Sequence, residues 1–108
     1  MNDPINNLIS ELRRGTLVLS VLSQLKEQQY GYSLKEHLAD YNIEIDQGTL
    51  YPLLRRLESQ GLLDSEWVVT ESRPRRYYQL NAAGQRVLDA LFQEWQTMVE
   101  SIERLIGG

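Results

Sequence analysis

The chain has 108 residues, no cysteine and a formal net charge of −4. Its length suits one domain with a single core, and the lack of cysteine excludes disulfides and thiolate metal sites. No segment approaches the roughly 20 apolar residues of a membrane span, and the opening MNDPINN has neither the basic nor the apolar region of a signal peptide. We therefore expect a cytoplasmic protein with no membrane partner.

The charge is distributed unevenly along the chain. Residues 1–46 carry four basic and seven acidic side chains, residues 47–80 carry five and four, and residues 81–108 carry two and four. Only the middle segment is net positive. A local basic region on an acidic chain favours specific, salt-sensitive DNA binding over indiscriminate binding to any duplex.

A long N-terminal helix is predicted from Ile5 to about Glu27, after the helix-start sequence Asn2-Asp3-Pro4. Its apolar residues occupy more than one face, which indicates that the helix is covered on two sides. One cover is its own domain, and the other requires something else, such as a second subunit.

A short second helix should follow the break at residues 28–31. Ser33 is expected to cap it, and Leu34, Leu38 and Tyr41 are expected to face the core. Residues 42–45 then supply a turn.

A third helix begins after Asp46, which is a good N-cap, and ends at Gln60-Gly61. One stripe of it is leucine, comprising Leu50, Leu53, Leu54 and Leu57. The opposite side carries Tyr51 and Arg55, so the helix packs inward and presents hydrogen-bond donors outward. Pro52 departs from the local rules, because a proline inside a helix removes a hydrogen bond.

Two strands follow, from LLDSEWVV and RRYYQL, joined by a tip with three arginines. The segment from Thr70 to Pro74 is interpreted as too long for a two-residue turn and therefore mobile without DNA. Trp67 is interpreted as a residue that packs the wing or the core. A helix followed by an arginine-tipped hairpin is the layout of a winged helix-turn-helix.

The last helix, from about Ala82 to Leu105, has the clearest periodicity. Asn81 caps it. Apolar residues recur at heptad spacing along roughly 36 Å, which is more than a domain of this size can cover. We therefore predict a homodimer, the commonest symmetric assembly. The predicted interface comprises Leu88, Leu91, Phe92, Trp95, Met98, Val99, Ile102 and Leu105.

Three motifs carry a family resemblance: GTLYPLLRRLESQGLL at 48–63, YGYSL at 30–34 and RRYYQLNAAG at 75–84. In this order and spacing they resemble the PadR-type transcriptional regulators, of the branch with one C-terminal helix. The resemblance implies a mainly α fold with a small β-hairpin, in which residues 1–80 form the winged helix-turn-helix and residues 81–108 the dimerisation helix. The helix at 5–27 also contributes to the dimer. It implies a regulator, most simply a repressor, that binds a palindromic operator in double-stranded DNA.

The candidate DNA contacts are polar residues of these elements. Arg55 and Tyr51 are predicted to reach base edges, since arginine can grip guanine with two hydrogen bonds. The full set is Ser33, Lys35, Gln47, Thr49, Tyr51, Arg55, Arg56, Arg73, Arg75 and Arg76. The first two would hold a phosphate, and the last three would form the wing contacts. Alternatively, Arg56 pairs with a nearby carboxylate, and Arg76 frames its strand.

Trp95 has two interpretations. Its heptad position predicts a dimer-core residue. The resemblance implies a slot between subunits that stacks a planar aromatic or phenolic effector on Trp95, with Leu91, Met98, Val18 and Leu22 as walls.

No catalytic arrangement is present in the sequence. It contains no nucleophile beside a base, no metal-ligand spacing and no glycine-rich phosphate loop, and His37 has no partner at useful spacing. We expect no enzyme activity, no cofactor and no metal. A second interpretation remains open, namely a winged-helix module whose arginines bind an acidic protein instead of DNA.

Overall fold

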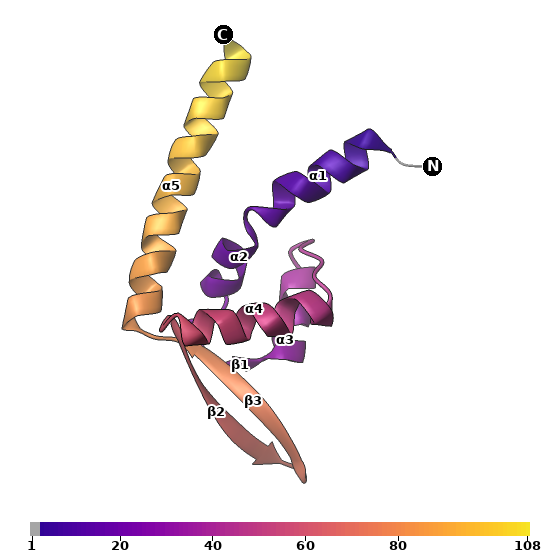
Figure 1. Cartoon of the computed structure of the whole chain (residues 1–108), viewed down its shortest axis with the longest axis vertical. Coiled ribbons are helices and arrows are strands. Elements are labelled where there is room, and N and C mark those ends of the chain that lie inside the picture. Colours follow the sequence, from indigo (N-terminus) through magenta and orange to yellow (C-terminus); the bar gives the residue numbers. More distant parts are fainter. Residues whose placement is uncertain (1–2) are drawn as a thin grey trace.

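The computed structural model describes residues 3–108, so that the first two residues of the predicted DNA-binding domain lie outside the described part. The elements, in chain order, are α1 (Pro4–Arg14), α2 (Leu17–Ser23), β1 (Gln29–Tyr30), α3 (Gly31–Ala39), α4 (Gln47–Ser59), β2 (Leu63–Thr70), β3 (Arg73–Leu80) and α5 (Ala82–Gly107). The fold is mainly helical, as predicted. Helices α2, α3 and α4 form a small body, from which α5 and the β2–β3 hairpin project in opposite directions (Figure 1).

The prediction of one helix over residues 5–27 is wrong, because the helix breaks at Gly15 and Thr16. Thr16 leaves helical geometry at φ −104° and ψ 4°, and its hydroxyl donates to the carbonyl of Arg13 at 2.8 Å. A threonine side chain that bonds to a nearby backbone carbonyl competes with the helix. The broad apolar pattern in the sequence therefore combines two helices that point in different directions.

Helix α3 begins three residues earlier than predicted, with Tyr30 as its N-cap in place of Ser33. The Ser33 hydroxyl donates to the Tyr30 carbonyl at 2.9 Å, so Ser33 lies in the first turn and does not cap it. Leu34 and Leu38 are buried as expected. Tyr41 is 65% exposed, because the helix ends at Ala39 and the chain turns away from the core.

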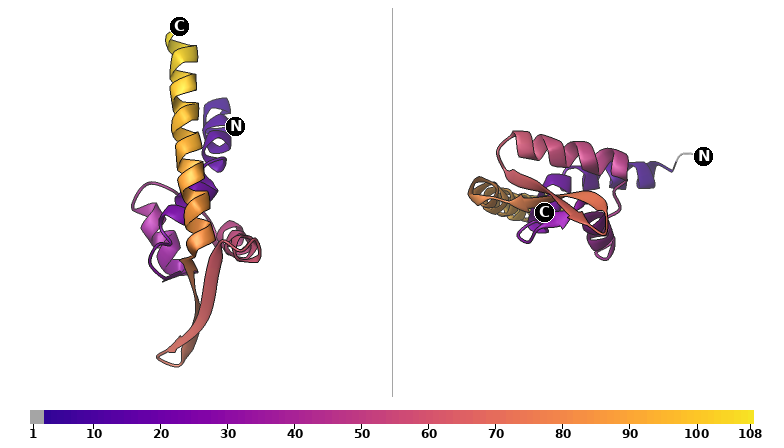
Figure 2. Two further views of the ribbon diagram at one scale, coloured as in Figure 1. Left: turned by 90° about the vertical axis from the view of Figure 1, so that its left-hand side faces the viewer. Right: turned by 90° about the horizontal axis from the view of Figure 1, so that it is seen from below.

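The hairpin belongs to a three-stranded antiparallel sheet in the order β1-β3-β2. In β1, Gln29 pairs with Tyr78 and Tyr30 pairs with Tyr77. The sequence interpretation omitted β1, since a two-residue strand is too short to produce an alternating pattern. Its pairing places the start of α3 beside the root of the hairpin (Figure 2).

The hairpin tip is a two-residue turn, contrary to the prediction of a longer loop. Thr70 pairs with Arg73, and both residues between them, Glu71 and Ser72, have positive φ angles of 52° and 62°. This backbone matches the twist of the strands but favours Asn-Gly over Glu-Ser. The sequence lacked the usual turn residues, which is why the turn was missed.

Replacing Glu71 with Asn and Ser72 with Gly should therefore stabilise the fold by about 1 kcal/mol, because both new residues tolerate positive φ. The free energy of unfolding from urea titrations measures the change. Ser72→Val serves as the opposite control and should lower stability. Equal stability of all three proteins would show that the turn is not strained.

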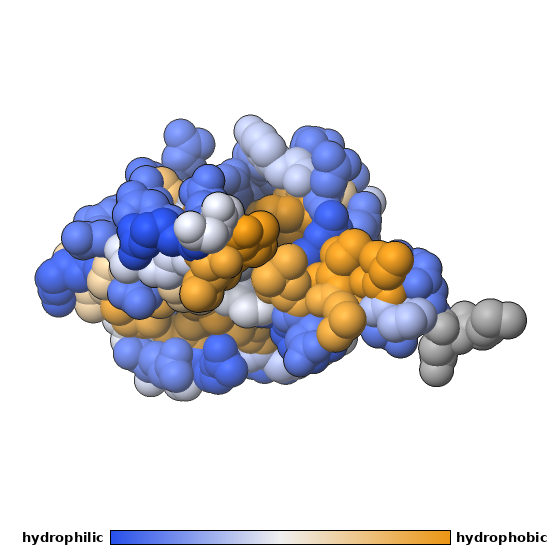
Figure 3. Space-filling view, turned by 90° about the horizontal axis from the view of Figure 1, so that it is seen from above, coloured by the Kyte–Doolittle hydropathy of each residue, from blue (hydrophilic) through white to orange (hydrophobic). Residues whose placement is uncertain are grey.

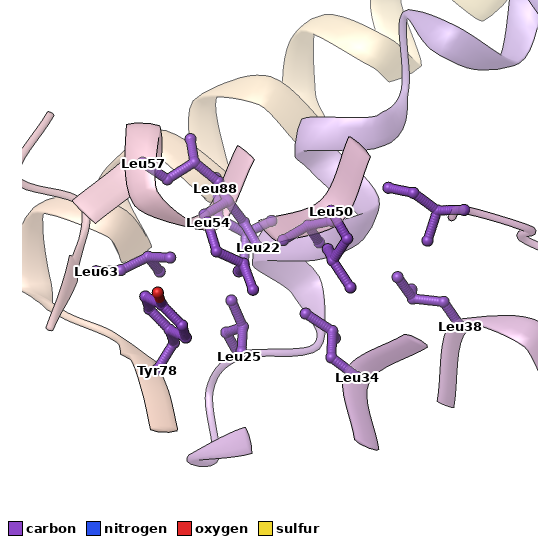
Figure 4. Close-up of a cluster of buried hydrophobic side chains, with 12 residues drawn as sticks. Leu22, Leu25, Leu34, Leu38, Leu50, Leu54, Leu57, Leu63, Tyr78 and Leu88 are labelled. Carbon is purple, nitrogen blue, oxygen red and sulfur yellow. The ribbon is translucent and has the colours of Figure 1, made fainter. Parts of the chain in front are cut away.

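The core lies where α2, α3 and α4 meet the sheet and the start of α5. Its side chains, among them Leu22, Leu54 and Tyr78, point toward one another in Figure 4. The buried residues of the core are Val21, Leu22, Leu25, Leu34, Leu38, Ile45, Leu50, Leu54, Leu57, Leu63, Tyr78 and Leu88. Of the predicted leucine stripe of α4, Leu50, Leu54 and Leu57 are buried, and Leu53 is half-buried against the same core.

Both predicted caps of the two long helices are confirmed. Asp46 accepts from the Thr49 amide at 2.8 Å, and Asn81 accepts from the Gly84 amide at 2.9 Å. Pro52 lies inside α4, which continues through it to Ser59. These caps fix where the two helices begin, and hence which of their residues face outward.

Gly84 is required by close packing at the start of α5. A Cβ atom there would overlap the Leu62 carbonyl oxygen and lie 2.6 Å from Leu80 Cδ1. Gly84→Ala should destabilise the protein by about 2 kcal/mol, because this overpacking outweighs the better helix propensity of alanine. Thermal unfolding measures the effect. Gly107→Ala, at a position with open space, is the control and should cost nothing.

Candidate nucleic-acid interface

A hollow of about 730 Å³ lies between α4 and the β2–β3 hairpin. Helix α4 contributes Gln47, Tyr51 and Arg55, which follow one another by one helical turn. The remaining lining comes from the start of α3 and from the wing and comprises Tyr30, Gly31, Tyr32, Trp67, Arg73, Pro74, Arg75, Arg76 and Tyr78. Aromatic faces and guanidinium groups therefore share one concave surface.

Tyr51 is held on the floor of this hollow by Gly31. A Cβ atom at Gly31 would overlap the Tyr51 ring, so the ring lies directly on the α3 backbone. The glycine of the YGYSL motif thus has a packing reason. It lets α3 and α4 approach closely enough for Tyr51 to remain half-buried with its ring in the hollow.

Arg75 is positioned by an aromatic stack. Its guanidinium carbon lies 4.5 Å from the centre of the Tyr30 ring, and Tyr30 meets Tyr77 edge to face at 5.3 Å. A stacked guanidinium uses its face and leaves its in-plane N–H groups to donate. Arg75 is therefore oriented in advance to bind an acceptor such as a phosphate or a base edge.

Arg76 has a different environment. Its Nη2 atom lies 2.8 Å from Glu58 Oε1, and its Nε atom donates to the Ser65 hydroxyl at 3.1 Å. Within residues 3–108 this is the one ion pair between side chains. The result favours the interpretation in which Arg76 frames its strand. Beside it, burial raises the pKa of the Tyr78 hydroxyl above its ordinary value, with the nearby Arg76 charge acting in the opposite direction. Tyr78 therefore stays protonated at neutral pH.

The hollow unites six of the ten predicted DNA contacts, namely Gln47, Tyr51, Arg55, Arg73, Arg75 and Arg76. The other four, Ser33, Lys35, Thr49 and Arg56, lie outside its lining. Sequence reasoning did not propose Tyr30, Tyr32 or Trp67 as part of this surface. Two of them belong to the YGYSL motif, so the motif was the available signal.

An exposed apolar band lies away from this hollow, on α5 and α1. In α5, Leu88 is buried and Leu91 and Val99 are half-buried, but the rest of the predicted dimer stripe is exposed. Trp95 is 41% exposed and Leu105 is 81% exposed. None of the 11 residues of α1, all described, is buried. Hydrophobic side chains form a broad band on the face seen from above in Figure 3.

A second hollow, of about 490 Å³, lies between α2 and α5. Its apolar part includes Phe92 and Trp95, whose rings stack with centres 6.1 Å apart. The whole lining comprises Thr16, Leu19, Ser20, Ser23, Lys26, Leu88, Asp89, Phe92 and Trp95. Of the five residues predicted to bind an effector, only Trp95 belongs to this lining.

The other four predicted effector residues lie elsewhere. Leu22 is fully buried in the core, and Val18 and Leu91 pack against that core. Met98 is exposed one turn further along α5. Leu22 was predicted to line the effector slot because the sequence shows that the helix is apolar but does not show which of its sides packs into the core.

No helix within residues 3–108 combines the length and the apolar character needed to cross a membrane.

Residues 18–90 match the Transcriptional regulator PadR-like family. The chain is similar to a PadR family transcriptional regulator from Eggerthella lenta, whose crystal structure is known. The two share 50% sequence identity and superpose with a TM-score of 0.92, and the match covers 94% of this chain and 91% of that one.

Two more distant relatives agree with this match. A transcriptional regulator of Mycobacterium tuberculosis is 33% identical over 99 residues, which cover 91% of this chain and 90% of the relative. The structure of a transcriptional regulator from Clostridium thermocellum is 26% identical, with a TM-score of 0.79, and covers 87% of this chain and 96% of that one. The family match includes the core, α4 and the wing, and the E. lenta structure extends the agreement to nearly the whole chain. The chain therefore belongs to the PadR-like family of transcriptional regulators.

Proposed function

We propose that the chain is a cytoplasmic transcriptional repressor that binds a palindromic operator as a homodimer. In this proposal α4 enters the major groove and the β2–β3 wing reaches the adjacent backbone or minor groove. The observation that carries the proposal is the first hollow, where Tyr51 and Arg55 of α4 face Arg73 and Arg75 of the wing. Arginine on two elements that face one another suits contact with both bases and phosphates of one duplex.

The exposed apolar stripe of α5, together with α1, supports the dimer. An apolar surface of this extent is unusual for a monomer in water and is typical of an interaction site. Two copies related by a two-fold axis would carry two α4 helices, and these would read half-sites about 10 bp apart. The hairpin that lines the first hollow and the outer part of α5 project in opposite directions, so both surfaces can be used at once (Figure 1).

The test is selection of bound duplexes from a random DNA pool at near-physiological salt. The expected result is an enriched palindrome with about one helical turn between half-sites. If retention instead disappears with rising salt and no sequence is enriched, the chain makes only non-specific phosphate contacts. In that case the proposal of an operator is wrong.

The second hollow supports the proposal that a planar aromatic or phenolic effector releases the repressor from DNA. Phe92 and Trp95 stack along its α5 side, so they offer aromatic surface to a flat ligand. Such a ligand weakens DNA binding only if it prefers the arrangement of the dimer that does not bind DNA.

Trp95→Ala should abolish the quenching of tryptophan fluorescence by a bound aromatic compound, because Trp95 would be the ring in contact with it. The chain has one other tryptophan, Trp67 on the wing, which is 63% exposed and provides the residual signal. Trp67→Phe is the matched control and should retain the quenching. Equal quenching with and without Trp95 would place the ligand elsewhere.

A further inference from the structure

We infer that Glu58 is a positioning residue for DNA binding, which together with Ser65 and Arg76 fixes the angle between the recognition helix α4 and the wing. This inference rests on the proposed function, because it concerns how the same surface is held in place. Glu58 does not line the hollow itself. Its effect on DNA would pass through the wing.

The three side chains form a closed ring of hydrogen bonds, which we call the clasp. Glu58 Oε1 accepts from Arg76 Nη2 at 2.8 Å, and Glu58 Oε2 accepts from the Ser65 hydroxyl. The Ser65 oxygen in turn accepts from Arg76 Nε at 3.1 Å. The clasp therefore joins α4, β2 and β3, the three elements that must keep a common geometry on DNA.

The position of the clasp along the hairpin gives it leverage. Strand β1 pairs with β3 only at Tyr77 and Tyr78, so from Arg76 outward the ladder pairs only β2 with β3. Arg76 is thus the first residue of β3 beyond the three-stranded part of the sheet. A second tie, from Gln28 Nε2 to Glu66 Oε1 at 2.6 Å, does not involve α4.

Glu58 also lies on the side of α4 that faces the wing. It follows Arg55 by three residues, as Arg55 follows Tyr51 by four, so these side chains occupy neighbouring positions on one face. Glu58 and Arg76 are each partly buried, with side chains 28% and 36% exposed. Partial burial and a third partner favour a defined geometry over a loose surface pair.

The sign of the effect separates positioning from simple electrostatics. Removing a negative charge beside a DNA-binding surface should strengthen binding, because the carboxylate repels phosphates. If Glu58 holds the wing, its removal should weaken binding, because the wing must then be ordered when DNA binds. The two explanations therefore predict opposite changes in affinity for one substitution.

The experiment compares Glu58→Ala with wild type in the 108-residue chain, using the palindrome enriched by selection. We expect affinity to fall about tenfold, and amide hydrogen exchange in free protein to accelerate in the outer wing but not in α5. Glu71→Ala removes the same charge from the wing tip, outside the clasp, and should bind at least as tightly as wild type. Dimer mass and unfolding temperature check that each variant is folded. If Glu58→Ala does not fold, Ser65→Ala, which removes only a hydroxyl, should show the same changes to a smaller degree.

A charge exchange distinguishes the clasp from a direct contact of Arg76 with phosphate. The double variant Glu58→Arg with Arg76→Glu restores the ion pair with its charges exchanged. Most of the lost DNA affinity should therefore return, together with the protection of the wing amides from hydrogen exchange. Persistent loss of affinity in this double variant would assign Arg76 to phosphate binding and overturn the inference. Affinity of Glu58→Ala equal to or above that of wild type would also overturn it. If the wild type selects no palindrome, the proposed function has failed, whereas hydrogen exchange still tests the clasp without DNA.

Discussion

Replacing Arg55 and Arg75 together with alanine is expected to abolish the proposed specific operator binding while the proposed dimer remains intact. Arg55 of α4 lines the hollow, and Arg75 of the wing lies over the ring of Tyr30 in β1. A bidentate contact between arginine and guanine contributes about 1–3 kcal/mol, and a wing contact adds to it. Affinity for the selected palindrome should fall by about a hundredfold or more.

Titration of a labelled duplex at fixed salt measures this loss. Arg86→Ala with Arg104→Ala is the matched control, because it removes two exposed arginines of α5 and changes the net charge equally. That control should bind nearly as wild type does. Undiminished DNA binding in the Arg55 and Arg75 variant would show that the hollow is not the reading surface. The arginines would then be better explained by an acidic protein partner.

Placing two charges in the apolar stripe should convert the proposed dimer into monomers. Met98 and Ile102 are one turn apart on α5, and each is about half exposed in the single chain. Glutamate at both positions would place four carboxylates in the two-fold interface, where desolvation and mutual repulsion oppose pairing. Specific DNA binding should weaken when the dimer is lost, since a monomer contacts one half-site and a dimer contacts two.

Sedimentation across a concentration series measures the assembly state. Gln93→Glu with Gln96→Glu adds the same two charges to exposed positions on the other side of the α5 heptad, so this control should remain dimeric. A dimer that persists in the Met98 and Ile102 variant would place the interface on another surface. Far-UV circular dichroism verifies that α5 is still helical in both proteins.

The sequence predicted those parts of the fold that depend on local chemistry. Asp46 and Asn81 mark the starts of α4 and α5 because a capping side chain bonds to amides two or three residues away. The break at Thr16 and the turn at Glu71-Ser72 could not be predicted in this way. The bond from the Thr16 hydroxyl to the Arg13 carbonyl is local, but threonine also occurs within helices, so its presence does not mark a break. Glu71 and Ser72 adopt positive φ angles although neither is a residue that favours them.

The candidate site was predicted in part for the same reason. Helical periodicity places Tyr51 and Arg55 on one face, whereas the inclusion of Tyr30 depends on a strand pairing between positions 30 and 77. The environment of Arg76 is set by Glu58, 18 residues earlier in the chain. Contacts at such sequence separation leave no periodic pattern, so the sequence alone could not decide between the two roles left open for Arg76.

Helix α1 has a consequence for how the protein responds to its own abundance. It has 11 residues, none of them buried, and isolated helices shorter than about 12–15 residues are marginal in water. If the partner subunit covers its apolar side, as we propose, the order of α1 follows mass action. Dilution would then unravel the N-terminal segment before the core, and synthesis of more protein would restore it. Such a regulator would be fully structured only above a threshold concentration.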